Sequence, residues 1–136
     1  MESTGQNILL IDDDPYMHEA VKMILEPEGF LVNCCLTGPD GLAAIRKQAP
    51  DLLLLDIMLA SPSEGFHLAY EIRKDDRSTH IPIIVLSAVG KTMGMSFAKE
   101  VGTDYLPVER FLEKPFEASE LREAVQQVLA KKGAAR

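Results

Sequence analysis

The fold is decided by the stretch Asp51-Leu52-Leu53-Leu54-Leu55-Asp56, in which four consecutive leucines end in an acidic residue. A short apolar run of this length predicts a buried strand. An earlier run, Asn7-Ile8-Leu9-Leu10-Ile11, ends in the same way with Asp12-Asp13-Asp14. Two such strands would bring carboxylates together at one edge of a parallel sheet, where two charges about 4 Å apart repel by roughly 4 kcal/mol at an effective dielectric near 20. The pattern therefore predicts a cluster of acids that is used to hold a cation.

Strands and helices alternate along the rest of the chain. Apolar runs predict strands at residues 7–12, 30–35, 51–56, 82–87 and 109–113. Helical periodicity predicts helices at residues 15–28, 39–48, 66–74, 93–101 and 118–131. This alternation predicts an α/β fold, a flavodoxin-like three-layer sandwich with a five-stranded parallel sheet in the order 2-1-3-4-5 and helices on both faces. In that order the first and third strands are neighbours about 4.8 Å apart, so Asp12 and Asp56 meet at the ligand-binding edge.

The composition fits a single globular domain. We predict that residues 7–131 of the 136 form the domain, with flexible ends at residues 1–6 and 132–136. The net charge of −7 argues against direct binding to nucleic acid or to an anionic membrane, because both need a basic patch. No apolar stretch approaches the ~20 residues that cross a bilayer, and no signal peptide is recognisable, so we predict a cytoplasmic protein.

The two cysteines, Cys34 and Cys35, are adjacent in an apolar run. A redox pair usually has two residues between its cysteines, and a zinc site needs more ligands. We therefore interpret them as two small apolar residues on opposite faces of a strand.

Two further strand ends carry chemistry. The fourth predicted strand ends at Ser87, and the fifth is followed by Lys114-Pro115. The same edge would then hold several carboxylates, a hydroxyl and an ammonium. This set suits phosphoryl transfer to a carboxylate, because a metal offsets the negative charge while the hydroxyl and the lysine hold the transferred oxygens.

Four stretches together resemble a receiver domain of a two-component response regulator: residues 8–15, 51–59, 81–88 and 111–116. The resemblance covers nearly the whole chain. It implies a phosphorylation-dependent signalling switch that accepts a phosphoryl group from a sensor histidine kinase or phosphotransfer protein and changes its binding face for a downstream protein. It also implies that the chain is not an enzyme, beyond catalysing its own aspartyl phosphorylation and dephosphorylation. The sequence names neither the kinase nor the downstream target.

The resemblance also implies a role for each site residue. Asp56 corresponds to the phosphoryl acceptor, and Asp13 and Asp56 to direct ligands of Mg²⁺. Asp12 would act largely through water, and Met58 would add its backbone carbonyl, an all-oxygen set that suits this ion. Asp14 is better explained as a helix cap than as a ligand.

Three other residues match the family's catalytic and switch positions. Ser87 corresponds to the hydroxyl that bonds a phosphoryl oxygen, and Lys114 to the lysine that pairs with Asp56 or its phosphoryl group. The Lys114–Pro115 bond is expected to be cis. Phe111 corresponds to the aromatic that turns inward with the Ser87 loop, although simple core packing and an alignment that chooses Tyr105 both remain open.

The chain departs from the family pattern in two loops. Ala60 stands at the usual proline position, and the turn up to Gly65 is one residue longer than usual. The spacing from Ser87 to Lys114 is longer by about five residues, which we place in residues 104–110. Met58 and Val89 flank the expected path of attacking water and cannot orient it, which predicts slow loss of the phosphoryl group.

Two alternatives share this fold. An aspartyl-phosphate phosphatase would have a second aspartate two residues after the first, where this chain has Met58. A binding module that no longer takes phosphate would not need the acids, the serine and the lysine together. The sequence also leaves open whether the chain is a stand-alone receiver or part of a longer regulator.

Overall fold

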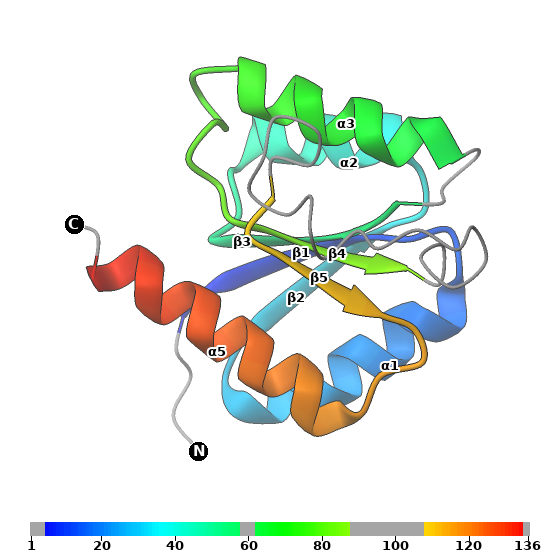
Figure 1. Cartoon of the computed structure of the whole chain (residues 1–136), viewed down its shortest axis with the longest axis vertical. Coiled ribbons are helices and arrows are strands. Elements are labelled where there is room, and N and C mark those ends of the chain that lie inside the picture. The colour runs from blue at the N-terminus through cyan, green and yellow to red at the C-terminus, as the bar shows by residue number, and fades with distance from the viewer. Residues whose placement is uncertain (1–4, 58–61, 88–107, 135–136) are drawn as a thin grey trace.

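The computed structural model describes residues 5–57, 62–87 and 108–134. These residues form a five-stranded parallel sheet between two layers of helices (Figure 1). The strands lie in the order β2-β1-β3-β4-β5, which confirms the predicted fold and strand order. Their bounds are β1 Asn7–Ile11, β2 Leu31–Cys35, β3 Leu52–Asp56, β4 Ile83–Ser87 and β5 Arg110–Glu113.

The helices divide between the two faces of the sheet. Helices α2 (Gly38–Lys47) and α3 (Pro62–Lys74) cover one face, and α1 (Pro15–Leu25) and α5 (Ala118–Ala134) cover the other (Figure 1). Successive side chains of a strand point to opposite faces, so each strand contributes to two separate cores. One core contains Leu53 and Leu55, and the other contains Leu52 and Leu54.

Three helix boundaries differ from the sequence predictions by more than one residue. Helix α3 begins at Pro62, not at residue 66; the residues of its first turn, Pro-Ser-Glu-Gly, include no large apolar residue from which periodicity could be recognised. The α-helix α1 ends at Leu25, and residues 26–28 form a short 3₁₀ turn η1 (Glu26–Glu28). Helix α5 runs to Ala134, past the predicted domain end at residue 131. The predicted helix at residues 93–101 lies outside the described residues.

The strand register brings the acidic ends level with one another. Ile11 of β1 pairs with Leu55 of β3, so Asp12 and Asp56 follow at the same height. Asp56 in turn pairs with Leu86 of β4. A slip of one residue would turn these side chains to the opposite face, so the register itself assembles the acids.

Two glycines allow helices to approach the sheet closely. A Cβ atom added to Gly65 of α3 would overlap the backbone of Ile57, the residue after Asp56. A Cβ atom added to Gly41 of α2 would instead overlap the side chain of Ile11. Gly65 therefore tolerates a larger side chain less well than Gly41 does, because backbone atoms cannot rotate away as a side chain can.

Arg73, near the end of α3, forms hydrogen bonds at the edge of the sheet where β4 and β5 begin. Its guanidinium donates to the carbonyls of Thr79 (3.0 Å) and Ile81 (2.5 Å), and to Glu109 Oε1 (2.6 Å). Glu109 Oε1 also accepts the backbone N–H of Ile83 (2.7 Å). One carboxylate oxygen therefore links α3, the first residue of β4 and the entry to β5.

The two cysteines have the surroundings expected of small apolar residues. Both are half-buried, Cys34 against the core under α1 and α5 and Cys35 against the core under α2 and α3. Burial raises the pKa of both thiols, and neither forms a disulfide. This confirms that they lie on opposite faces of β2.

Among the helices in the described parts of the chain, none combines the length and the apolar character needed to span a bilayer.

Candidate functional site

Asp12 follows β1 and is fully buried, yet each of its carboxylate oxygens has a partner. Oδ1 accepts the backbone N–H of Asp14 (2.9 Å), and Oδ2 accepts from Lys114 Nζ (2.9 Å). Its backbone N–H donates to the carbonyl of Cys35 (3.1 Å). A buried carboxylate needs such partners, because burial without hydrogen bonds strongly disfavours the charged form.

Asp56 ends β3 and is almost as deeply buried, with 5% of its surface exposed. Asp13 is exposed beside it. One carboxylate oxygen from each of Asp12, Asp13 and Asp56 lies within 4.8 Å of the others. The structure therefore brings together the three acids that the sequence singled out.

Lys114 reaches this cluster from the end of β5. Its ammonium lies 2.9 Å from Asp12 Oδ2 and 3.7 Å from Asp56 Oδ2, and its side chain is 20% exposed. The Lys114–Pro115 peptide is cis, as the resemblance implied.

Three carboxylates lie in the cluster, and among the described residues Lys114 is the cation that the structure pairs with them. The donors are all oxygens, and they are spaced closely enough to share one ion. Mg²⁺ prefers such ligands and keeps several waters of its own, so one exposed and two buried carboxylates fit this ion.

Asp14 does not belong to the acidic cluster. Its Oδ1 accepts the backbone N–H of Tyr16 (2.9 Å), and its extended backbone makes it the N-cap of α1. Pro15 follows at the first helical position. The structure confirms Asp14 as a helix cap.

The other predicted residues are placed only in part. Ser87 is the last residue of β4 and pairs with Glu113, which puts its backbone at the same edge. Phe111 is half-buried against the core under α2 and α3 and pairs with Val85. Met58, Val89 and Tyr105 lie outside the described residues.

His18 is a neighbour of the site that the sequence did not reveal. Its Nε2 lies 2.6 Å from the backbone carbonyl of Asp12, and its side chain is half-buried. The sequence signal is weak, because His18 is connected to Asp12 only by its position about one helical turn after the cap Asp14.

Comparisons with known proteins agree with this geometry. Residues 8–126 match the family model of the response regulator receiver domain. The chain is 34% identical over 122 residues to the DNA-binding dual master transcriptional regulator RpaA of Synechocystis, covering 90% of this chain and 48% of RpaA. It is 33% identical over 129 residues to the phosphate regulon transcriptional regulatory protein PhoB of Pseudomonas aeruginosa, covering 95% of this chain and 54% of PhoB. The chain thus spans about half the length of these curated relatives.

Two solved structures share the fold over nearly their full length. The receiver domain of NtrX from Brucella abortus superposes with a TM-score of 0.75 at 31% identity, covering 90% of this chain and 98% of that one. The receiver domain of the sensor histidine kinase PA1611 from P. aeruginosa superposes with a TM-score of 0.78 at 26% identity, covering 93% of this chain and 99% of that one. The latter holds a magnesium ion in its active site cleft. The chain described here therefore belongs to the response regulator receiver domain family, the phosphorylation-dependent switches of two-component signalling.

Proposed function

We propose that this chain accepts a phosphoryl group on Asp56 from a histidine kinase or phosphotransfer protein, in the presence of Mg²⁺. One observation carries the proposal: the Asp56 carboxylate lies at the end of a central strand, within 4.8 Å of Asp12 and Asp13 and 3.7 Å from Lys114. Asp56 is buried enough to be held in one position, and the exposed Asp13 marks the side open to solvent.

Phosphoryl transfer requires the protein mainly to position the reacting groups and to offset their negative charge. A carboxylate oxygen of Asp56 forms a bond to phosphorus while the bond from phosphorus to the donor's imidazole nitrogen breaks. The second nitrogen of the phosphorylated imidazole carries a proton, so the imidazole leaves in its neutral form as that bond breaks. Lys114 is already within reach of Asp56, so its ammonium offsets charge on the transferred oxygens without a large movement.

Asp12, Asp13 and Asp56 would hold the Mg²⁺, with Met58 contributing its carbonyl as the resemblance implies. When bound, the ion supplies the positive charge that the cluster lacks and orients the phosphoryl oxygens. Asp12 is already engaged with Asp14 and Lys114, which supports a role for it through water rather than as a direct ligand.

We propose that Ser87 and Phe111 transmit the effect of phosphorylation at Asp56 to the protein surface. Ser87 would bond a phosphoryl oxygen from the end of β4, and Phe111 would move within the core under α2 and α3. The altered surface would bind a downstream protein. We further propose that the chain has no turnover substrate of its own, that it makes no direct contact with nucleic acid or membrane, and that it works in the cytoplasm beside its phosphodonor.

The test is phosphorylation by a small phosphodonor. The protein is incubated with Mg²⁺ and acetyl phosphate, and its intact mass is compared with that of Asp56→Asn and Asp51→Asn. Asp51 stands at the other end of the β3 segment, where its Oδ2 accepts the backbone N–H of Asn7 (2.7 Å), so its variant is a matched control. The parent and Asp51→Asn should gain one phosphoryl group and Asp56→Asn none. An unmodified parent, or equal gain by Asp56→Asn, would overturn the proposal.

A further inference from the structure

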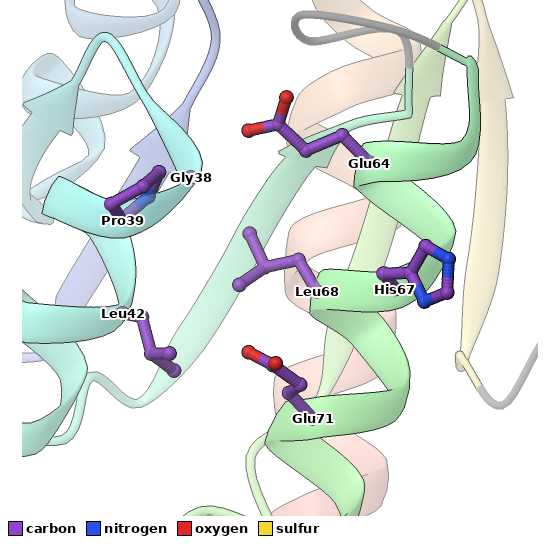
Figure 2. Close-up of a pocket in the computed structure, with 7 residues that line it drawn as sticks. All are labelled: Gly38, Pro39, Leu42, Glu64, His67, Leu68 and Glu71. Atoms are coloured by element: carbon purple, nitrogen blue, oxygen red, sulfur yellow. The ribbon is translucent and has the colours of Figure 1, made fainter.

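A pocket of about 260 Å³ lies between α2 and α3, and none of its lining residues belongs to the acidic cluster (Figure 2). Sites for drug-sized ligands are usually about 300–1,000 Å³, so this one has room for one or two side chains rather than a whole molecule. It is open at the surface, on the helical layer opposite α1 and α5.

The floor of the pocket is apolar. Gly38, Pro39 and Leu42 line it from α2, and Leu68 faces them from α3 (Figure 2). Gly38 begins α2 directly after its cap, Thr37, and has no side chain to fill the space beside Leu68. An apolar side chain entering here would lose contact with water without meeting a buried polar group.

The rim of the pocket is acidic on the α3 side. Glu64 and Glu71 stand four residues before and three residues after Leu68, so all three share one face of the helix. Figure 2 shows both carboxylates extending toward α2 on either side of Leu68. Seven helical residues span about 10.5 Å, which sets the spacing of the Glu64 and Glu71 backbone positions along α3.

Glu71 is the better exposed of the two acids. Its side chain has no ion-pair partner within the part of the chain that the structure describes, and it borders an apolar floor on a protein of net charge −7. A cation placed here would meet uncompensated negative charge at the edge of a surface that also favours apolar contact.

We propose that this pocket binds a basic amphipathic helix of a partner protein. The partner would carry cationic side chains at positions i and i+7 and an apolar side chain at i+4. The apolar group would enter the pocket against Leu42 and Leu68, and the two cations would reach Glu64 and Glu71. The match follows from helix geometry, since two helices with the same rise per residue repeat over the same seven-residue length.

The charge spacing decides between this partner and a small cation. A single ammonium or guanidinium group cannot contact two carboxylates separated by two helical turns, whereas a helix presents two cations at that spacing without strain. The pocket shares no residue with the acidic cluster, so its binding can be tested apart from phosphorylation at Asp56.

The experiment uses the full chain and a fluorescein-labelled, alanine-based helical peptide with arginine at i and i+7 and leucine at i+4. Binding is followed by fluorescence anisotropy, and the contacted surface is mapped by amide chemical shifts. Glu64→Gln and Glu71→Gln are each expected to weaken binding about two- to fivefold, the range for an exposed charge pair. Glu19→Gln, an exposed position of α1 on the other helical layer, is the matched control and should bind as the parent does.

Two changes to the probe sharpen the test. Replacing its leucine by serine should weaken binding roughly tenfold, because the apolar contact is lost. Replacing the arginine that faces Glu71 by glutamate should abolish binding to the parent and restore it to Glu71→Arg. The Asp56→Asn variant should bind the original probe like the parent, so failure of the phosphorylation proposal would leave this result unchanged.

Three outcomes would overturn the proposal. Equal affinity of the parent, Glu64→Gln and Glu71→Gln would show that the rim acids do not recognise the probe. Shift changes confined to residues outside α2 and α3 would place the peptide elsewhere. Self-association of the chain that Glu71→Arg abolishes, without peptide binding to the parent, would assign the pocket to a second copy of this protein.

Discussion

Lys114 Nζ lies closer to Asp12 (2.9 Å) than to Asp56 (3.7 Å), so the ammonium is paired with the acid that is not the proposed acceptor. The fully buried Asp12 needs this partner more than Asp56 does. Phosphorylation of Asp56 would add negative charge within reach of the same ammonium, and the two carboxyl sites would then compete for it.

Replacing Lys114 by glutamine should destabilise the metal-free protein and make Mg²⁺ more stabilising. A buried acceptor that loses its partner costs about 1–3 kcal/mol. Without the Lys114 ammonium, a divalent cation also meets less competition for the carboxylates of the cluster. Urea unfolding with and without Mg²⁺ measures both effects, and equal stabilisation of parent and variant by Mg²⁺ would contradict the prediction.

Replacing Asp13 by asparagine should have opposite effects in the two conditions. In the absence of Mg²⁺ the variant should be more stable by about 0.2–1 kcal/mol, because one of three crowded, like charges is removed. In its presence the variant should gain less stability than the parent, because an oxygen ligand has been weakened. A lower urea midpoint without Mg²⁺ would show that repulsion in the cluster is not significant.

Asp14 lies next to the acidic cluster in the sequence, but its carboxylate caps helix α1. Asp14→Ala should lower the free energy of unfolding by about 0.5–2 kcal/mol, the cost of losing a helix cap. Asp14→Asn keeps a capping oxygen and should be nearly neutral. Neither change should alter the apparent Mg²⁺ affinity in a titration. A tenfold loss of affinity in both variants would make Asp14 a ligand.

Gly65→Ala should destabilise the protein by about 1–3 kcal/mol, because the added methyl group meets the backbone of Ile57. The same change at Gly41 meets the end of the Ile11 side chain and should cost less. Because Ile57 follows Asp56, Gly65→Ala should also slow phosphorylation by acetyl phosphate. Equal unfolding midpoints for the two variants would mean that the helix can shift without cost.

Cys34 and Cys35 should react slowly with iodoacetamide in the folded protein at mildly alkaline pH. Burial raises both pKa values and so lowers the fraction present as the reactive thiolate. The reaction should become faster as the pH rises toward the shifted pKa values, and it should be rapid at any of these pH values after unfolding in guanidinium. Mass spectrometry counts the alkylated thiols, and equal rates for folded and unfolded chains would contradict the buried placement.

The sequence predicts the three central strands, β1, β3 and β4, well because they are buried on both faces of the sheet. The run from Leu52 to Leu55 can hardly be anything but a central strand, and the order of strands then places Asp12 beside Asp56. The strand ends also identify Ser87 and Lys114 as residues of the same edge. These inferences need only topology, which short apolar runs and their acidic ends reveal.

Side-chain partners are less accessible from the sequence. Nothing local indicates that Lys114 favours Asp12, which is 102 residues away, over Asp56. The start of α3 at Pro62 was missed because a polar first turn leaves no apolar periodicity. The pocket between α2 and α3 depends on the distance between two helices, which side-chain packing determines and no single segment encodes.

The contact between Arg73 and Glu109 bears on how this chain tolerates insertions. Glu109 is held by α3 and by the first residue of β4, immediately before β5 starts. The point at which the chain enters its last strand is therefore fixed independently of the length of the connection that leads to it. Residues added or removed before Val108 would leave the spacing from Glu109 to Lys114 unchanged, so the length of that connection can vary while the chemistry at the far edge keeps its geometry.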